Sequence, residues 1–200
     1  MLAGLLVVAS IVSGEGDDAV TVDLMIALAP EGMLCAGLLA VFAVMMARLR
    51  YSRAYGAALA ASVLALAAAA LTLGEESLRF HGSYRVDLFS QVFKLLILAG
   101  LCAILLFGRD LKDIRPGVRS EYIFFLLTAS LGLLVLVSSV ELITLVVALE
   151  TASFSLYLLV PLRDEGRGLR VQLESAIKYV LFGLVSTGLM LWGISYLYGV

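Results

Sequence analysis

The chain has 200 residues, of which 62% are hydrophobic and 15% are charged, and its net charge is −2. An average soluble domain has about 45–50% apolar and about 25% charged residues, so this composition argues against a soluble fold. The charges also cluster between long apolar runs, which is the pattern of membrane spans that alternate with loops.

Histidine and cysteine are too sparse for a metal centre. The chain has one histidine, His81, and two cysteines, Cys35 and Cys102, both inside apolar runs. A CxxC motif, a cysteine–histidine cluster and a glycine-rich phosphate loop are all missing from the sequence. This argues against zinc, an iron–sulfur cluster, a disulfide framework and a nucleotide site. We therefore expect no metal and no cofactor in this chain, and any redox centre to lie elsewhere.

Residues 1–22 form a lead segment before the first predicted span. Its apolar run, Met1 to Gly14, is followed by the acidic string EGDD. The length of the run is typical of the core of a signal peptide, but the basic residues that precede such a core are missing. We favour an extra apolar turn that lies against its neighbours, with the signal peptide as the alternative.

The remaining residues, 23–200, contain six apolar segments that are long enough to cross a bilayer, for which a helix needs about 20 residues. The predicted spans are 24–47, 55–73, 88–107, 121–137, 140–162 and 175–198. The fold class is therefore all-α, a polytopic membrane bundle of six helices. Pro30 is tolerated near a helix start, and we expect Glu31 beside it to lie at the membrane interface. The second span is rich in alanine, which lets helices approach closely.

The connections give further local predictions. The string RFHGSYRV between the second and third spans alternates in polarity, which predicts a short strand or a hairpin. Asp87 opens the third span, where a carboxylate favours the positive end of the helix dipole. Only two or three residues separate the fourth and fifth spans, so these helices are expected to be antiparallel neighbours. Ser138 and Glu141 fit a capping box at the start of the fifth span.

The basic residues predict the orientation. One side of the membrane receives ten of the 14 basic residues: Arg48, Arg50, Arg53, Arg109, Lys112, Arg115, Arg119, Arg163, Arg167 and Arg170. The other side receives only Arg79 and Arg85, while Lys94 and Lys178 lie inside spans. Loops rich in lysine and arginine stay in the cytoplasm, so we expect the N-terminus to face outward.

Glu150 is the main candidate for chemistry because it lies at the middle of the fifth span. It is roughly 15 Å from the nearer membrane face at 1.5 Å per residue. Carboxylates at that depth cost about 3 kcal/mol on insertion scales and are functional by default. Ser153 at i+3 and Tyr157 at i+7 are expected to share its face and to help line a wet path. The alternative is a structural hydrogen bond to another helix.

Two lysines complete the set of intramembrane candidates. Lys178 is a candidate partner of Glu150, since the two residues differ by about 8 Å in expected depth. The alternative for Lys178 is an i,i+4 pair with Glu174 at the membrane edge. Lys94 lies seven residues inside the third span, where it either belongs to the proton path or extends its amine outward to the interface.

Several strings of the chain resemble a family. They are LAPE at the first span, YRVDLFSQVFKLL at the third, VALETASFSLYLL in the fifth and ESAIKYVLFGLVSTG in the sixth. In this order and spacing, from about Asp23 to Tyr198, they resemble subunit N of the proton-pumping NADH:quinone oxidoreductases, respiratory complex I. The resemblance implies the N-terminal portion of an antiporter-like inverted-repeat fold. Family members have about 14 spans, so we expect a fragment, a split subunit or a truncated copy.

The resemblance also implies a function. By position, Glu150 matches the key glutamate of the family's fifth helix, Lys178 a lysine of the sixth, and Lys94 a lysine of the third. The chain would move protons through a Glu/Lys path, driven by quinone reduction in other membrane subunits of complex I. NAD, FMN, iron–sulfur clusters and quinone would be bound by those partners, in a bacterial inner membrane. The alternatives are a subunit of a multi-subunit cation/proton antiporter, a subunit of a membrane-bound hydrogenase, or a purely structural scaffold.

Overall fold

The computed structural model describes residues 28–73, 77–79, 84–109, 114–162 and 169–198. Within these ranges it has six helices that are long and apolar enough to cross a membrane, which confirms the predicted bundle. The helices are α3 (Ala29–Met46), α4 (Tyr51–Leu71), α5 (Leu88–Phe107), α6 (Arg119–Ser138), α7 (Leu142–Leu159) and α8 (Leu169–Tyr198). The short 3-10 helices η2 (Pro116–Val118) and η3 (Val160–Leu162) precede α6 and follow α7. The lead segment 1–22 and His81 lie outside the described residues.

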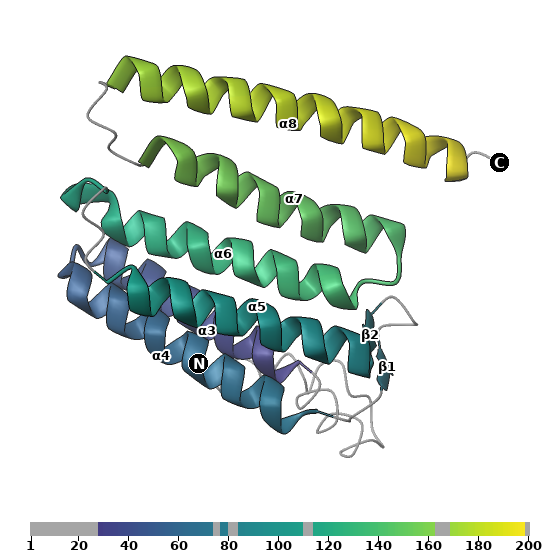
Figure 1. Ribbon diagram of the computed structural model, residues 1–200, viewed down its shortest axis with the longest axis horizontal. Helices are drawn as coiled ribbons and strands as arrows, with labels where there is room; N and C mark the ends of the chain where they lie inside the picture. The colour runs from purple at the N-terminus through teal and green to yellow at the C-terminus, as the bar shows by residue number, and fades with distance from the viewer. Residues whose placement is uncertain (1–27, 74–76, 80–83, 110–113, 163–168, 199–200) are drawn as a thin grey trace.

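The predicted hairpin is confirmed at one end of the bundle. Strands β1 (Ser77–Arg79) and β2 (Tyr84–Val86) pair antiparallel, with Ser77 opposite Val86. Figure 1 shows the hairpin beside the start of α5. Tyr84 also bridges to Ser139, just after α6. The hairpin therefore joins the start of α5 to the end of α6.

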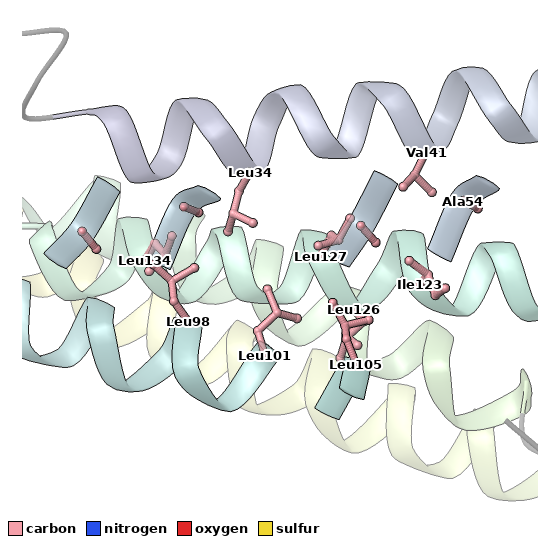
Figure 2. Close-up of a cluster of buried hydrophobic side chains, with 13 residues drawn as sticks. Leu34, Val41, Ala54, Leu98, Leu101, Leu105, Ile123, Leu126, Leu127 and Leu134 are labelled. Atoms are coloured by element: carbon pink, nitrogen blue, oxygen red, sulfur yellow. The ribbon is translucent and has the colours of Figure 1, made fainter. Parts of the chain in front are cut away.

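Helices α3 to α6 pack around one hydrophobic core, and α7 and α8 follow to one side of it (Figure 1). Figure 2 shows leucine side chains of α5 and α6 that meet Leu34 and Val41 of α3. The buried cluster consists of Leu34, Val41, Ala54, Ala58, Ala65, Ala69, Leu98, Leu101, Leu105, Ile123, Leu126, Leu127 and Leu134. α7 packs on α6, and α8 packs on α7 and η3.

Small residues bring α3 and α4 together, as the alanine content of the second span predicted. The buried residues of α4 are alanines and one serine: Ala54, Ala58, Ala61, Ser62, Ala65 and Ala69. A side chain on Gly37 of α3 would run into the Ala61 methyl group. Small residues at both positions thus let the two backbones approach closely. Helices in a bilayer associate through such close packing, because the hydrophobic effect does not drive them together in lipid.

The start of α5 is capped by Asp87 and Ser90. The Asp87 carboxylate accepts from the Ser90 backbone N–H at 2.8 Å, and Ser90 Oγ lies 3.0 Å from the Asp87 backbone N–H. The hydrogen bond from the Ser90 backbone holds the pKa of Asp87 below its usual value. α5 therefore begins at Leu88, as the sequence predicted.

The capping box predicted for Ser138 and Glu141 is wrong. α6 continues through Ser138, so this serine is the last residue of one helix and cannot cap the next one. Glu141 occupies the N-cap of α7, but its side chain accepts no capping hydrogen bond and is exposed. The apolar run before Ser138 keeps α6 helical to its end, which leaves only residues 139–141 for the turn.

A glycine sets the distance between α6 and α7. A Cβ on Gly132 would lie 2.7 Å from the backbone nitrogen of Ala152 and 3.0 Å from the carbonyl oxygen of Ala148. A backbone neighbour cannot swing aside as a flexible side chain does. The close approach of the two helices therefore depends on the missing side chain.

We predict that Gly132→Ala lowers the thermal unfolding midpoint in detergent, with a loss of about 1–3 kcal/mol from overpacking. The matched control is Gly100→Ala on α5, where a Cβ meets nothing within 4 Å. That change should leave the midpoint unchanged or raise it, since alanine is favoured over glycine in a helix by up to about 1 kcal/mol. An unaltered midpoint for Gly132→Ala would contradict the close helix contact.

Candidate functional site

Glu150 lies at the middle of α7 and faces α8. It is half-buried and about 12–14 Å from either end of the helix at 1.5 Å per residue. Thr187 of α8 donates its hydroxyl to Glu150 Oε1 at 2.7 Å and also lies 3.1 Å from the carbonyl oxygen of Gly183. The carboxylate is thus oriented by a neighbouring helix at the depth where its charge is costly.

Lys178 lies on α8 but does not reach Glu150. Its Nζ is 2.6 Å from Oε1 of Glu174, one turn earlier, and both side chains are exposed, by 65% and 61%. Of the two alternatives that the sequence left open, this is the i,i+4 pair. Among the ion pairs between described residues, none joins Lys178 to Glu150.

The register between α7 and α8 explains the separation. Glu150 lies level with Thr187, which is nine residues beyond Lys178 on α8. At 1.5 Å per residue, the two charged groups are offset by about 13 Å along the helix axis. The depths expected from the sequence differ by only about 8 Å, because they are counted from Arg163 and Arg170 as if these two arginines lay at the same level.

Tyr157 lies between the two charged groups. Its ring packs edge-on against Tyr179, with centroids 4.9 Å apart, and its hydroxyl lies against Gly183. Gly183 is about midway between Lys178 and Thr187 on α8. Tyr157 therefore places a hydroxyl in the gap between α7 and α8 at the level that separates Glu150 from Lys178. Ser153 is half-buried one turn along from Glu150.

Lys94 belongs to a second group of polar residues, at the hairpin end of the bundle. It is only 2% exposed, and its Nζ lies 2.8 Å from Glu31 Oε1 and 2.9 Å from the Tyr84 hydroxyl. Tyr84 donates its hydroxyl to the same Oε1 at 2.7 Å. A lysine on a helix extends toward the helix N-terminus, which here brings the amine to the first turn of α3. We call Glu31, Lys94, Tyr84 and the adjoining Ser138 the hairpin cluster.

Glu31 lies in the first turn of α3, at the end of its span. It is only 7% exposed, because the hairpin and α5 cover it. Burial and the Glu31 carboxylate raise the pKa of Tyr84 well above its usual range, so this hydroxyl stays protonated and donates. The sequence alone did not indicate that Glu31 and Tyr84 are partners of Lys94. One signal in the sequence could have indicated the pair. Lys94 and Glu31 each lie near the start of a predicted span, and both of these spans begin on the same side of the membrane.

The described residues contain no group of three or more histidine, cysteine, aspartate or glutamate side chains that would hold a metal ion.

Comparison with known proteins identifies what the chain is similar to. Residues 139–200 match the family model described as NADH:quinone oxidoreductase/Mrp antiporter, TM. The chain is 45% identical to NADH-quinone oxidoreductase subunit N 2 of Opitutus terrae, over 85% of its own length and 36% of the relative. It is 35% identical to subunit N of Geobacillus kaustophilus, over 86% of its length and 35% of the relative.

A solved structure agrees with these relatives. A chain of respiratory complex I from Thermus thermophilus with bound aureothin superimposes with a TM-score of 0.71 at 34% identity. The match covers 85% of this chain and 36% of that chain. The resemblance to subunit N is thereby confirmed, as is the antiporter-like helical fold. The chain spans about a third of the length of the relatives that it matches.

The buried Lys94–Glu31 pair leads to a prediction about stability. Lys94→Met should lower the free energy of unfolding by about 3–5 kcal/mol, because it leaves a carboxylate buried without its cation. The double variant Glu31→Gln/Lys94→Met should recover most of this loss, since no unpaired charge remains. Denaturant unfolding in detergent measures both changes. A double variant as unstable as the single one would contradict the account.

Proposed function

We propose, from its similarity to subunit N of NADH-quinone oxidoreductase, that this chain is part of a proton-translocating membrane subunit of complex I. The observation that carries the proposal is Glu150, a carboxylate at the middle of a membrane-spanning helix that is turned toward α8 by Thr187. A purely structural scaffold would need no acid at that depth. An intramembrane carboxylate lowers the stability of the inserted helix, and such residues are therefore rare outside functional sites.

The proposed path runs between α7 and α8. Glu150 is its central acid and Lys178 its basic end, with the Tyr157 hydroxyl between them. Ser153 adds a hydroxyl one turn from Glu150. Since about 13 Å separates the two charged groups along the axis, a proton would cross the gap through water molecules and the hydroxyl groups. Thr187 acts as a positioning residue that orients the Glu150 carboxylate.

The energy for the transfer would come from quinone reduction in partner subunits. Moving one charge against 100 mV requires about 2.3 kcal/mol, and this chain has no predicted redox centre to supply it. NAD, FMN, iron–sulfur clusters and quinone would be bound by those partners. Within the oxidoreductase, the chain's part would be translocation and not electron transfer.

We place the chain in a bacterial inner membrane with its N-terminus outside. The ten basic residues that the sequence assigns to one side support this orientation. The hairpin end of the bundle would then face outward and the arginine-rich loops the cytoplasm. Lys94, in the hairpin cluster, would belong to the outer part of the proton path.

A second candidate is a subunit of a multi-subunit cation/proton antiporter. The matched family model covers both NADH:quinone oxidoreductases and Mrp antiporters, and both chemistries use a buried acid. Transport that depends on sodium in sealed vesicles would favour the antiporter, whereas transport that depends on quinone reduction would favour complex I.

We predict that Glu150→Gln in the assembled complex lowers the number of protons moved per electron, because the amide keeps the Thr187 hydrogen bond but takes up no proton. Proton uptake and NADH oxidation in proteoliposomes measure the ratio. The matched control is Glu141→Gln, an exposed glutamate at the N-cap of the same helix, which should leave the ratio unchanged. An unchanged ratio in Glu150→Gln would refute the assignment.

The role of Lys178 in proton transfer can be tested by comparing substitutions of Lys178 and of Glu174, its partner in the ion pair. Lys178→Ala should reduce the proton-to-electron ratio if the amine carries protons, whereas Glu174→Gln, which breaks the same pair, should change it far less. The same proteoliposome assay measures both variants. Equal ratios in Lys178→Ala and in the unaltered complex would leave Lys178 as part of a surface pair and would remove it from the path.

A further inference from the structure

The hairpin cluster is built from four separate elements. Glu31 comes from α3, Lys94 from α5, Tyr84 from β2 and Ser138 from the end of α6. All four are buried, with exposures of 7%, 2%, 6% and 1%. Two of them, Glu31 and Lys94, carry opposite charges, so the cluster is neutral as it stands. Sites assembled from distant segments hold their groups in fixed positions because the surrounding packing determines each side chain.

The cluster is not fully satisfied. Oε1 of Glu31 accepts from both Lys94 and Tyr84, while the other carboxylate oxygen, Oε2, has no hydrogen-bond partner among the described residues. The Ser138 hydroxyl is buried beside the Tyr84 hydroxyl. A buried ion pair that serves only stability normally has its remaining lone pairs satisfied. Oε2 is therefore an open acceptor on a buried acid.

The surroundings indicate which ligand the open oxygen would accept. The Lys94 ammonium already neutralises the carboxylate and would repel a metal ion, whereas a proton needs no more room than an O–H bond. Cys35, one turn along α3, is a further titratable side chain close enough to interact with Glu31. Arg85 and Asp87, on either side of Val86, pair with each other at 3.4 Å. Their side chains are 59% and 30% exposed, while Tyr84 on the same strand points inward. Tyr84 of the buried cluster and the exposed Arg85 are thus adjacent on β2 at the hairpin end.

We propose that the hairpin cluster is a second proton-binding site, in which Oε2 of Glu31 takes up a proton from water at the hairpin end of the bundle. An O–H bond forms at Oε2, a hydronium ion becomes water, and the cluster passes from neutral to a charge of +1. Lys94 keeps its proton and its hydrogen bond to Tyr84, and Tyr84 keeps donating to Oε1. The site is separate from Glu150, and only its link to pumping rests on the proposed function.

Infrared difference spectroscopy of the intact complex, recorded across a pH titration, tests the site. Acidification should give the C=O band of a protonated carboxylic acid, shifted in D₂O, that is missing in Glu31→Gln and present in Glu141→Gln. The same band in Glu31→Gln, or its absence from the unaltered complex wherever the complex stays folded, would overturn the proposal.

Tyr84→Phe gives a second, milder variant for the case that Glu31→Gln does not fold. It removes the hydroxyl that donates to Oε1 of Glu31 at 2.7 Å. The C=O band of Glu31 should therefore change its frequency in Tyr84→Phe, because the hydrogen bonding of the carboxyl group has changed. An unchanged frequency would refute the assignment of the band to this cluster.

The proton-to-electron ratio separates this proposal from the proposed function. A Glu31 band together with full pumping in Glu150→Gln would refute the proposed path and leave the site standing. Loss of pumping in Glu150→Gln without a Glu31 band would refute the site and leave the path standing.

Discussion

A charge inside a bilayer has to meet a partner, and this constraint organises the bundle. Glu31 and Glu150, two carboxylates within spanning helices, are each turned toward a neighbouring element. Glu31 is neutralised by Lys94 and held by Tyr84. Glu150 receives a hydroxyl from Thr187. Each contact crosses between elements, so the charges that are costly in lipid also fix how the helices sit against one another.

The two contacts act on different halves of the structure. The Glu31–Lys94 pair ties α3 to α5 within the four-helix core and fastens the hairpin over their ends. The Glu150–Thr187 bond, with Tyr157 against Gly183, joins α8 to α7 outside that core. An ion pair buried so fully stabilises little by comparison with apolar packing. Its presence is therefore better explained by what the acid does than by what it adds to stability.

Much of the fold could be predicted from local sequence. Hydropathy located all six spans, and the bounds of α5 agree because Asp87 caps its start. Alternation located the hairpin. The predicted capping box was wrong because the sequence does not indicate how far α6 continues. The helix extends through Ser138, so this serine cannot form a capping box with Glu141. The sequence also did not reveal that Glu31 is buried, since only the folded hairpin covers that residue.

The candidate site was harder to predict than the fold. Glu150 could be identified from its depth alone, and the position of Tyr157 follows from the helical spacing. The partner of Lys178 could not be predicted, because the axial register between α7 and α8 is set by side-chain packing around Gly183 and not by either sequence alone. Thr187 had no sequence signal, since a threonine in an apolar helix usually bonds its own backbone.

The most direct test of the central claim is an electron cryo-microscopy map of the assembled complex at a resolution that shows ordered water. The account predicts that the Glu150 carboxylate contacts Thr187 and that density for water and for the Tyr157 hydroxyl continues from it toward Lys178. A Glu150 side chain that faces acyl chains, with dry apolar packing between it and Lys178, would contradict the account.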